Sequence, residues 1–449
     1  MSNLTADWRD RPTHRRVWAL AAPMILSNIS VPLVALVDST VIGHLPHAHQ
    51  LGAVAVGASL YTFLAWAMGF LRMGSTGFAA QAAGRGDGAA LRQILLQGLL
   101  LAFGLALVLG AMGVPLSTVA LHFMQPSAEL DQLTREFFHT RLFGLPAALA
   151  SYALVGWFLG TQNARAPLAI LLSTNLINIA LNLWFVLGLE WGVVGAARAS
   201  VIAEWTGALI GLLMTRKALR AYPGHIVWAA LTLWHSWRPL LAVNRDIFIR
   251  SLALQSVFFL ITVQGTRLGD ATVAANALLL NGLLLTAHAL DGLAHAVEAL
   301  CGHALGARDR DALRRSLVVA GGWSLLASLG FAALFLLAGH LFIEMQTDIQ
   351  SVRDTAFIYL PYLAVLPLIA VWSYLLDGLF IGATRAREMR NGMVLTVVLV
   401  LPFGWALQGW GNHGLWITFL LFMLLRSLTL GVIAWRLRRH DGWFTGSTH

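Results

Sequence analysis

Residues 17–42 read VWALAAPMILSNISVPLVALVDSTVI, and this stretch decides the fold class. A helix of roughly 20 apolar residues crosses the roughly 30 Å hydrocarbon core of a bilayer, so the stretch is long enough to span one. It contains one carboxylate, Asp38, and two prolines, Pro23 and Pro32. A charged side chain at membrane depth is costly unless it faces a cavity or a partner. We therefore expect Asp38 to be a proton or cation site; the alternative is an acid solvated at the membrane interface.

The composition of the 449 residues indicates a polytopic membrane protein. The chain is 58% hydrophobic and 11% charged, whereas a soluble domain carries about 25% charged residues. Its single cysteine, Cys301, excludes an internal disulfide, and three loop histidines (His44, His47 and His49) have no carboxylate beside them, so we expect no metal site. The chain has no GxxxxGK[ST] motif and no nucleophile–base spacing. We expect neither a cofactor nor an enzymatic activity.

Twelve apolar stretches follow one another, and we expect each to be a transmembrane helix of an all-α membrane protein. Their ranges are 17–42, 53–80, 94–115, 137–160, 167–188, 194–215, 247–265, 273–303, 317–340, 356–381, 392–409 and 414–435. One set of loops, together with both tails, holds 22 of the 30 lysines and arginines, and the opposite loops hold only Arg135, Arg267 and Arg353. By the positive-inside rule, both termini are cytoplasmic. The net charge of +9 thus indicates topology and attraction to anionic lipid, and no nucleic-acid binding is expected.

One constant offset, the step from Thr40 to Thr262, brings the two halves of the chain into register. The matches are Thr40-Val41-x-Gly43 with Thr262-Val263-x-Gly265, Gly84-x-x-Asp87 with Gly306-x-x-Asp309, and Phe158-x-Gly160 with Phe380-x-Gly382. Each half holds six spans, so both halves enter the membrane in the same orientation. We expect two six-helix lobes, residues 1–215 and 247–449, related by a pseudo-two-fold axis along the membrane normal. A basic cytoplasmic linker, residues 216–246, joins them.

The halves differ at polar positions inside the spans. The repeat offset pairs Asp38, Asn175, Asn178 and Asn182 with Leu260, Val397, Val400 and Gly404, respectively. The three asparagines recur at steps of three and four residues, so they share one helix face. We expect them to line a pocket with Asp38 that relays protons or binds a cation. The alternative is that they only join helices through hydrogen bonds.

The second half carries its own charged residues within spans. Asp291 and Glu298 are seven residues apart, two turns along one face, and His288 and His295 share that step. The candidate substrate or second-lobe polar site consists of Asp291, His295, Glu298, Asp377 and Arg72. The candidate counter-ions within spans are Arg72, Arg198, Arg250 and Arg426. Such residues are costly in a bilayer unless they line a wet cavity or pair with one another.

Several short motifs together resemble those of the MATE (multidrug and toxic compound extrusion) family. They are LVDSTVIGHL at 36–45, QAAG at 81–84, FLGTQNAR at 158–165 and FIGATRAR at 380–387. The segments GFLRMG at 69–74, LDG at 290–292 and EAL at 298–300 are similar to the DinF-like branch of that family. The likeness extends over the full chain.

This resemblance implies a monomeric antiporter in the cell inner membrane that exports organic cations or other amphipathic compounds in exchange for protons or sodium. Drugs and membrane lipids would be its partners. Asp38 matches the acid of the first helix in the family, Pro23 its bending proline, and Asn178 and Asn182 its polar pair in the fifth helix. Many relatives carry aspartate where Asn182 stands, so one titratable group is missing here.

Two other functions stay open from the sequence. A lipid-linked saccharide flippase of related fold would need a strongly cationic cavity, for which Arg72, Arg198 and Arg250 are the available residues. An integral-membrane enzyme would need a convergent acid–base set, and only the segment from His288 to His303 could supply it.

Overall fold

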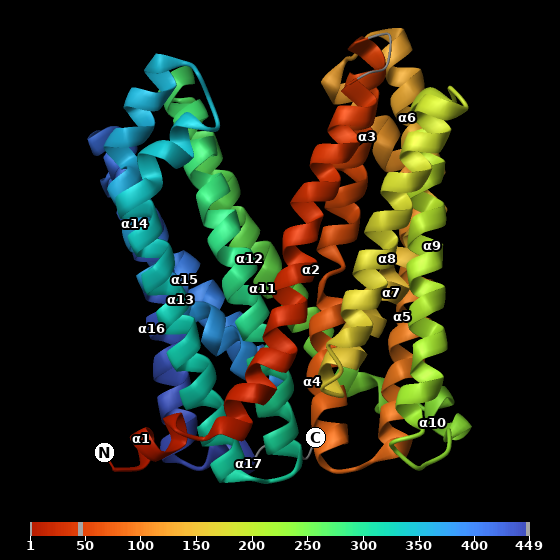
Figure 1. Ribbon diagram of the computed structural model, residues 1–449, viewed down its shortest axis with the longest axis vertical. Coiled ribbons are helices and arrows are strands. Elements are labelled where there is room, and N and C mark those ends of the chain that lie inside the picture. Colours follow the sequence, from red (N-terminus) through yellow and green to blue (C-terminus); the bar gives the residue numbers. More distant parts are fainter. Residues whose placement is uncertain (1, 44–47, 446–449) are drawn as a thin grey trace. The chain divides into compact units, whose positions relative to one another are not determined.

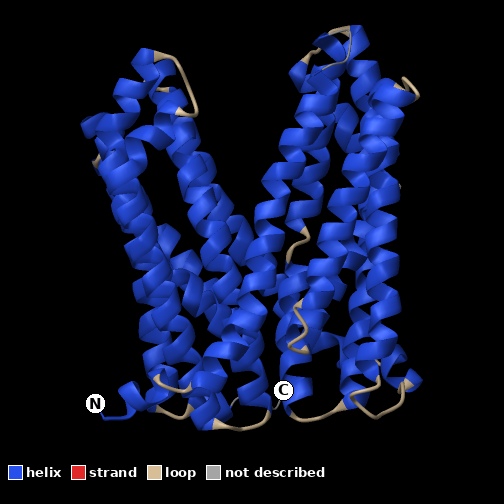
Figure 2. Ribbon diagram, viewed as in Figure 1, coloured by secondary structure: helices blue, strands red, loops and turns tan. Residues whose placement is uncertain are grey.

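The computed structural model describes residues 2–43 and 48–445, without the side chains of residues 2–3, 32–39, 42, 48 and 445. Within these residues every regular element is a helix (Figure 2). The first half contains α1 (Ser2–Trp8), α2 (Arg11–Gly43), α3 (Ala48–Ala67), α4 (Phe70–Gly84), α5 (Gly88–Met124), α6 (Ala128–Leu142), α7 (Leu145–Gly160), α8 (Arg165–Asn182), the π-helix η1 (Leu183–Gly188) and α9 (Gly192–Leu219). The second half contains α10 (Trp228–Thr232), α11 (Trp234–Thr266), α12 (Asp270–Gly306), α13 (Arg310–Glu344), α14 (Gln350–Gly382), α15 (Ala386–Ala406), the 3-10 helix η2 (Gln408–Trp410), α16 (Gly411–Arg439) and α17 (Gly442–Thr445).

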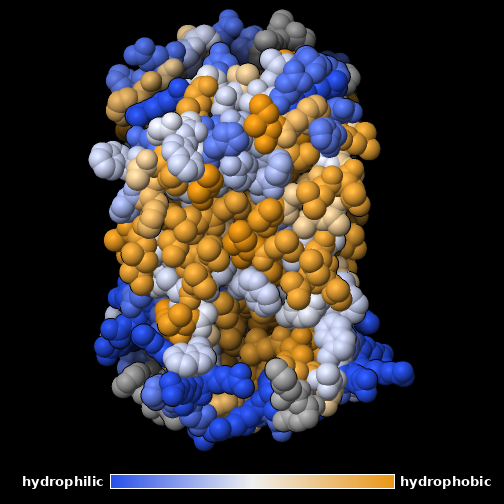
Figure 3. All heavy atoms as spheres, turned by 90° about the vertical axis from the view of Figure 1, so that its left-hand side faces the viewer, coloured by the Kyte–Doolittle hydropathy of each residue, from blue (hydrophilic) through white to orange (hydrophobic). Residues whose placement is uncertain are grey.

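Each of the twelve predicted spans coincides with one long helix or with consecutive helices. Among the described residues, ten helices are long and apolar enough to cross a membrane. An eleventh is added if α6 and α7, which meet at a bend of 46°, count as one span. On the face drawn in Figure 3, hydrophobic side chains form a belt between hydrophilic ends. The predicted all-α membrane fold is confirmed.

The internal repeat reappears as two equivalent helix crossings, of which the first joins α7 to α4. Gly156 lies so close to α4 that a Cβ there would collide with the carbonyl oxygen of Arg72. One turn later, a Cβ on Gly160 would lie 2.6 Å from the carbonyl oxygen of Thr76. Glycine is needed at both places because only a residue without a side chain lets two helix backbones approach this closely.

The second crossing, of α14 on α12, uses the residues that the repeat offset pairs with the first. A Cβ on Gly378 would lie 2.6 Å from the carbonyl oxygen of Ala294, and one on Gly382 would collide with that of Glu298. The repeat in the sequence therefore specifies the same backbone packing twice.

Equivalent aspartates also begin equivalent helices. Asp87 caps α5 by accepting a hydrogen bond of 2.9 Å from the backbone N–H of Ala90. Asp309, its repeat equivalent, caps α13 by accepting a bond of the same length from Ala312. Each side chain satisfies a backbone donor that the first turn of a helix leaves unpaired.

The contacts divide the chain into two compact units, and the helices within each run side by side (Figure 1). The N-terminal unit is Leu26–Leu240, and the C-terminal unit is Met1–Ile25 together with Leu241–His449. The segment that ends at Ile25 joins the C-terminal unit because α1 docks on α13. Asp7 of α1 pairs with Arg314 (Oδ2 to Nε, 2.8 Å). The lobe boundaries at 215/216 and 246/247 stay a prediction.

The predicted linker docks in the equivalent place on α5 of the N-terminal unit. Arg92, the repeat equivalent of Arg314, donates from Nη1 to the carbonyl oxygen of Tyr222 (2.8 Å) and from Nη2 to that of Leu219 (3.2 Å). Burial in this loop raises the pKa of the Tyr222 phenol. Within residues 216–246, α9 continues to Leu219, α10 covers Trp228–Thr232 and α11 begins at Trp234.

We expect Gly156→Ala to destabilise the N-terminal unit by about 1–3 kcal/mol, the usual cost of overpacking, because the added methyl group would force α7 away from α4. The matched control is Gly104→Ala on α5, where a Cβ would meet nothing within 4 Å. That change should be neutral or slightly stabilising, since alanine favours helices. Thermal unfolding of the two purified variants in the same detergent measures the difference. Equal transition temperatures would contradict the close crossing.

Candidate functional site

Three asparagines of α8 form polar contacts in the N-terminal unit, two of them with the neighbouring helices α2 and α9. Asn175 donates a hydrogen bond to the Ser30 hydroxyl of α2 (2.7 Å), and Asn178 donates to the Ser200 hydroxyl of α9 (2.9 Å). Asn182 donates to the side-chain oxygen of Asn178 (3.0 Å). Asn178 and Asn182 are buried, with exposed fractions of 8% and 1%. The face predicted from their spacing is thus a continuous polar contact between three helices.

Asp38 lies on α2, and its side chain is outside the described part of the chain. The level of its backbone follows from helical geometry. Asp38 is eight residues beyond Ser30, about 12 Å along α2, and Asn182 is seven residues beyond Asn175, about 10.5 Å along α8. The first and fifth spans run in the same direction, and Ser30 contacts Asn175. The backbone of Asp38 on α2 therefore lies at about the same height along the helix axes as that of Asn182 on α8.

Pro23 lies within α2, which continues through it as one helix. A proline nitrogen carries no hydrogen, so the carbonyl of Ala19 has no helical donor at this turn. The division between the two contact units falls two residues later, between Ile25 and Leu26. Bending of α2 at Pro23 stays a prediction.

The C-terminal unit brings Asp377 together with two of the predicted counter-ions. The Nη2 atoms of Arg250 and Arg426 both donate to Oδ2 of Asp377. All three side chains are buried, with exposed fractions of 4%, 3% and 7% for Arg250, Arg426 and Asp377. The guanidinium of Arg426 also lies 5.7 Å from the centre of the Tyr374 ring. The cluster joins α11, α14 and α16 within the hydrophobic core of the unit.

The cluster contains two positively charged arginines but only one carboxylate, so its charges balance only if a second acid contributes. Oδ1 of Asp377 and the Nε atoms of both arginines have no hydrogen-bond partner within the described residues. Asp291 of α12 is near enough to Arg250 to attract it electrostatically. Two carboxylates then balance two guanidinium groups, as buried charges require.

The other α12 candidates occupy the next two turns after Asp291. His295 and Glu298 are buried, with exposed fractions of 8% and 2%, and Asp291 is half-buried. Their helix packs along α14, which carries Asp377. The structure thus brings four of the five predicted residues of this polar site into one unit.

Arg72, the fifth, belongs to α4 of the N-terminal unit, so no single unit contains the whole predicted set. It is half-buried, and its carbonyl oxygen accepts a hydrogen bond from Thr76 (2.9 Å). Arg198, another candidate counter-ion, is exposed, and its guanidinium lies 5.3 Å from the Trp191 ring centre. The structure therefore gives Arg198 an aromatic neighbour and no ion pair among the described residues.

Sequence reasoning missed a partly buried cluster at the bend between α6 and α7. Glu204 of α9 accepts a hydrogen bond from Arg141 (3.0 Å) and from the Tyr61 hydroxyl (3.2 Å). The Arg141 guanidinium also lies 3.9 Å above the Tyr61 ring. Next to it, Trp205 donates to the carbonyl oxygen of Phe143 (2.9 Å), in the break itself. One feature of the sequence could have indicated this cluster: Glu204 is an acid inside a predicted span, and the repeat offset pairs it with Arg426.

No group of three metal-ligating side chains occurs within the described residues. His44 and His47 lie outside them, and His49 Nδ1 is 3.5 Å from a carboxylate oxygen of Glu129. Cys301 is fully buried in α12.

Comparison with known proteins gives consistent results in sequence and structure. The MatE family model matches residues 23–184 and 247–406, once in each half. The DNA damage-inducible protein F of Escherichia coli is 44% identical over 96% of this chain and 94% of its own. Multidrug resistance protein PmpM of Pseudomonas aeruginosa is 26% identical over 92% and 89%. A transporter of the MOP superfamily from Pyrococcus furiosus shares the fold, with a TM-score of 0.84 at 17% identity over 99% of both chains.

Proposed function

This chain belongs to the MatE family of multidrug and toxic compound efflux transporters, and from that membership we propose that it exports organic cations or other amphipathic compounds in exchange for protons. The relative from Pseudomonas aeruginosa carries the name of a multidrug resistance protein, which supports drugs as substrates. The family consists of transporters, so the enzymatic alternative is dropped. Neither a cofactor nor a partner chain is part of the proposal.

The observation that carries the ion coupling is the polar contact of α8 with α2 and α9. A buried amide such as that of Asn182 needs hydrogen-bond partners, and Asp38 comes at its level on α2. We propose that Asp38, Asn175, Asn178 and Asn182 form the ion-coupling site, with the Ser200 hydroxyl as a further oxygen ligand for a cation or hydrogen-bond partner.

Protonation would change what Asp38 can do in this site. An ionised carboxylate only accepts hydrogen bonds, whereas a protonated one also donates. Proton entry from outside would therefore change its pairing with Asn178 and Asn182 and alter α2, with Pro23 as the bending point. A state of α2 that binds the exported compound less tightly would release it outward. The reaction cycle then needs one titratable group in this site, which fits the presence of Asn182 in place of a second acid.

The polar residues of the C-terminal unit have a different proposed role. Oδ2 of Asp377 accepts from both Arg250 and Arg426, so the carboxylate is held in place by charge pairing. We propose that Asp291, His295 and Glu298 on α12 contact substrate or water, and that Arg72 does so from α4. The flippase alternative loses support, because Arg250 is paired with Asp377 and Arg198 is exposed.

We place the protein in the cell inner membrane as a monomer, with both termini in the cytoplasm. The excess of lysine and arginine in one set of loops supports this orientation. Anionic lipids would contact the same loops.

Transport in proteoliposomes tests the function. The purified protein is reconstituted, and the uptake of a panel of fluorescent organic cations is followed with a pH gradient and a sodium gradient imposed separately. The proposal expects movement of the cations against their gradient when protons flow the other way, and none with sodium alone. Transport with the sodium gradient only would overturn proton coupling, and no transport with either would overturn antiport.

A further inference from the structure

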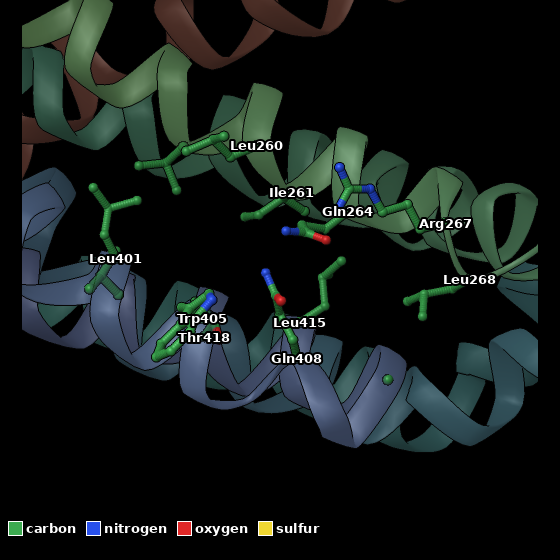
Figure 4. A pocket seen from close by; sticks show the side chains of 14 residues that line it. Leu260, Ile261, Gln264, Arg267, Leu268, Leu401, Trp405, Gln408, Leu415 and Thr418 are labelled. Carbon is green, nitrogen blue, oxygen red and sulfur yellow. The ribbon is translucent and has the colours of Figure 1, made fainter.

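The C-terminal unit contains a cavity of about 410 Å³ between α11 on one side and α15, η2 and α16 on the other. Side chains from the two sides face one another across it (Figure 4). The volume falls within the roughly 300–1,000 Å³ of small-molecule sites. All of its lining residues belong to one unit, so the cavity is a property of that unit by itself.

The helices around this cavity are the repeat equivalents of those that carry the proposed ion site. Leu260 of α11 and Val400 and Gly404 of α15 line the cavity. By the repeat offset, these three positions correspond to Asp38, Asn178 and Asn182. The two halves thus have equivalent positions on equivalent helices. The N-terminal half has an acid and two amides at these positions, whereas the C-terminal half has apolar residues.

These replacements change the kind of ligand that the cavity can bind. Of the described residues that line the cavity, Arg267 is the only charged one. Without a carboxylate, a cation has no ligand of opposite charge and a proton has no acid to bind. An apolar wall instead favours an alkyl chain, because its burial removes hydrocarbon from water into a fitted site.

Polarity in the cavity increases from one end to the other. Val257 and Leu260 lie deep in the span, whereas Gln264 and Arg267 lie toward the end of α11, and Gln408 lies opposite in η2. The step from Val257 to Arg267 covers about 15 Å of helix. Arg267 is exposed and has no ion-pair partner among the described residues. An unpaired guanidinium at the polar end fits a carboxylate or phosphate group.

We propose that this cavity, on the helices equivalent to the ion site, binds an anionic amphiphile with a single alkyl chain. The chain lies along Leu260, Val400 and Gly404, and the anionic head group pairs with Arg267 beside Gln264 and Gln408. Binding needs neither an ion gradient nor Asp38, so the site is independent of the transport mechanism proposed above.

Equilibrium binding to the full-length protein tests the site. The protein is placed in nanodiscs of zwitterionic lipid, and a dansylated undecanoate is titrated, with empty nanodiscs as the background. Gly404→Leu fills the cavity, since even a Cβ there would lie 3.2 Å from Thr418. Gly330→Leu on α13 is the matched control, because a Cβ there meets nothing within 4 Å. Thr418→Leu fills the same space from α16 and serves if Gly404→Leu does not fold.

We expect either filling variant to lose the saturable fluorescence increase, while Gly330→Leu keeps it. Arg267→Gln should weaken binding of the undecanoate about fivefold, the equivalent of an exposed charge pair of about 1 kcal/mol, and leave a neutral amide of the same probe unaffected. Arg353→Gln changes another arginine of the predicted outer loops. It should alter the affinity for neither the undecanoate nor its amide. Equal binding by wild type and both filling variants would overturn the site, and an unchanged affinity in Arg267→Gln would overturn the anionic head group.

Discussion

Asp38→Asn is expected to reduce proton-driven export to the level of liposomes without protein, while leaving the purified protein folded. Asparagine has nearly the same shape as aspartate but cannot take up or release a proton, so the step that links proton entry to release of the compound is lost. The measurement is accumulation of a fluorescent organic cation in proteoliposomes with an imposed pH gradient. The change should not destabilise the fold, because asparagine keeps the volume of aspartate and can still accept hydrogen bonds.

Asp270→Asn is the matched control for this experiment. It makes the same chemical change at an exposed acid in the first turn of α12. Its transport rate should equal that of the wild type. Export by Asp38→Asn against a gradient at the wild-type rate would remove Asp38 from the coupling mechanism, and the acids of α12 would be the next candidates.

Asp377→Asn is expected to cause the largest loss of stability, because it leaves Arg250 and Arg426 buried without their shared carboxylate. Removing one partner of a buried ionic contact costs about 3–5 kcal/mol, most of it the penalty of an uncompensated charge. Unfolding of the detergent-purified protein, followed by heating and size-exclusion chromatography, measures the shift. The control is Asp354→Asn, an exposed acid of the same helix, whose loss should have little effect.

A combined variant separates charge imbalance from loss of shape. Changing the three residues together, as Asp377→Leu, Arg250→Met and Arg426→Met, removes the charges of Asp377 and both arginines at similar volume. Such replacements are often neutral or stabilising. We expect the triple variant to unfold at a higher temperature than Asp377→Asn. If Asp377→Asn instead unfolds like the wild type, the buried arginines are compensated by other groups.

Much of the fold could be predicted because it depends on features that sequence displays directly. Span length follows from the thickness of the bilayer, and each predicted span coincides with observed helices. The repeat offset also aligns residues that have the same structural role in the two halves. It pairs Gly156 with Gly378, and each lies at a close helix crossing, of α7 on α4 and of α14 on α12, respectively.

The pairing of side chains was harder to predict. Helical spacing placed the asparagines of α8 on one face, but it could not show that Asn178 meets Ser200 on another helix. Nothing in the sequence links Arg141 to Glu204, since their contact joins spans that are distant in the chain. The docking of the segment before Ile25 on the C-terminal unit likewise depends on a long-range pair, Asp7 with Arg314.

The substitutions between the halves were visible in sequence, whereas their consequence was not. The offset alone shows that Leu260 replaces Asp38, but only the structure shows that Leu260 and Gly404 enclose a cavity. A residue difference between two copies of a repeat therefore identifies a candidate site, and the packing around that site then shows which ligand it can bind.

The most direct test of the account is the number of protons released when an exported compound binds. Isothermal titration in buffers of different ionisation enthalpy measures this number for wild type and Asp38→Asn. Because binding of the compound and protonation of Asp38 oppose one another, linkage predicts release of about one proton from the wild type in the pH range where Asp38 titrates. Asp38→Asn should bind the compound and release none. Equal proton release from both proteins would contradict the claim that Asp38 couples ion entry to export.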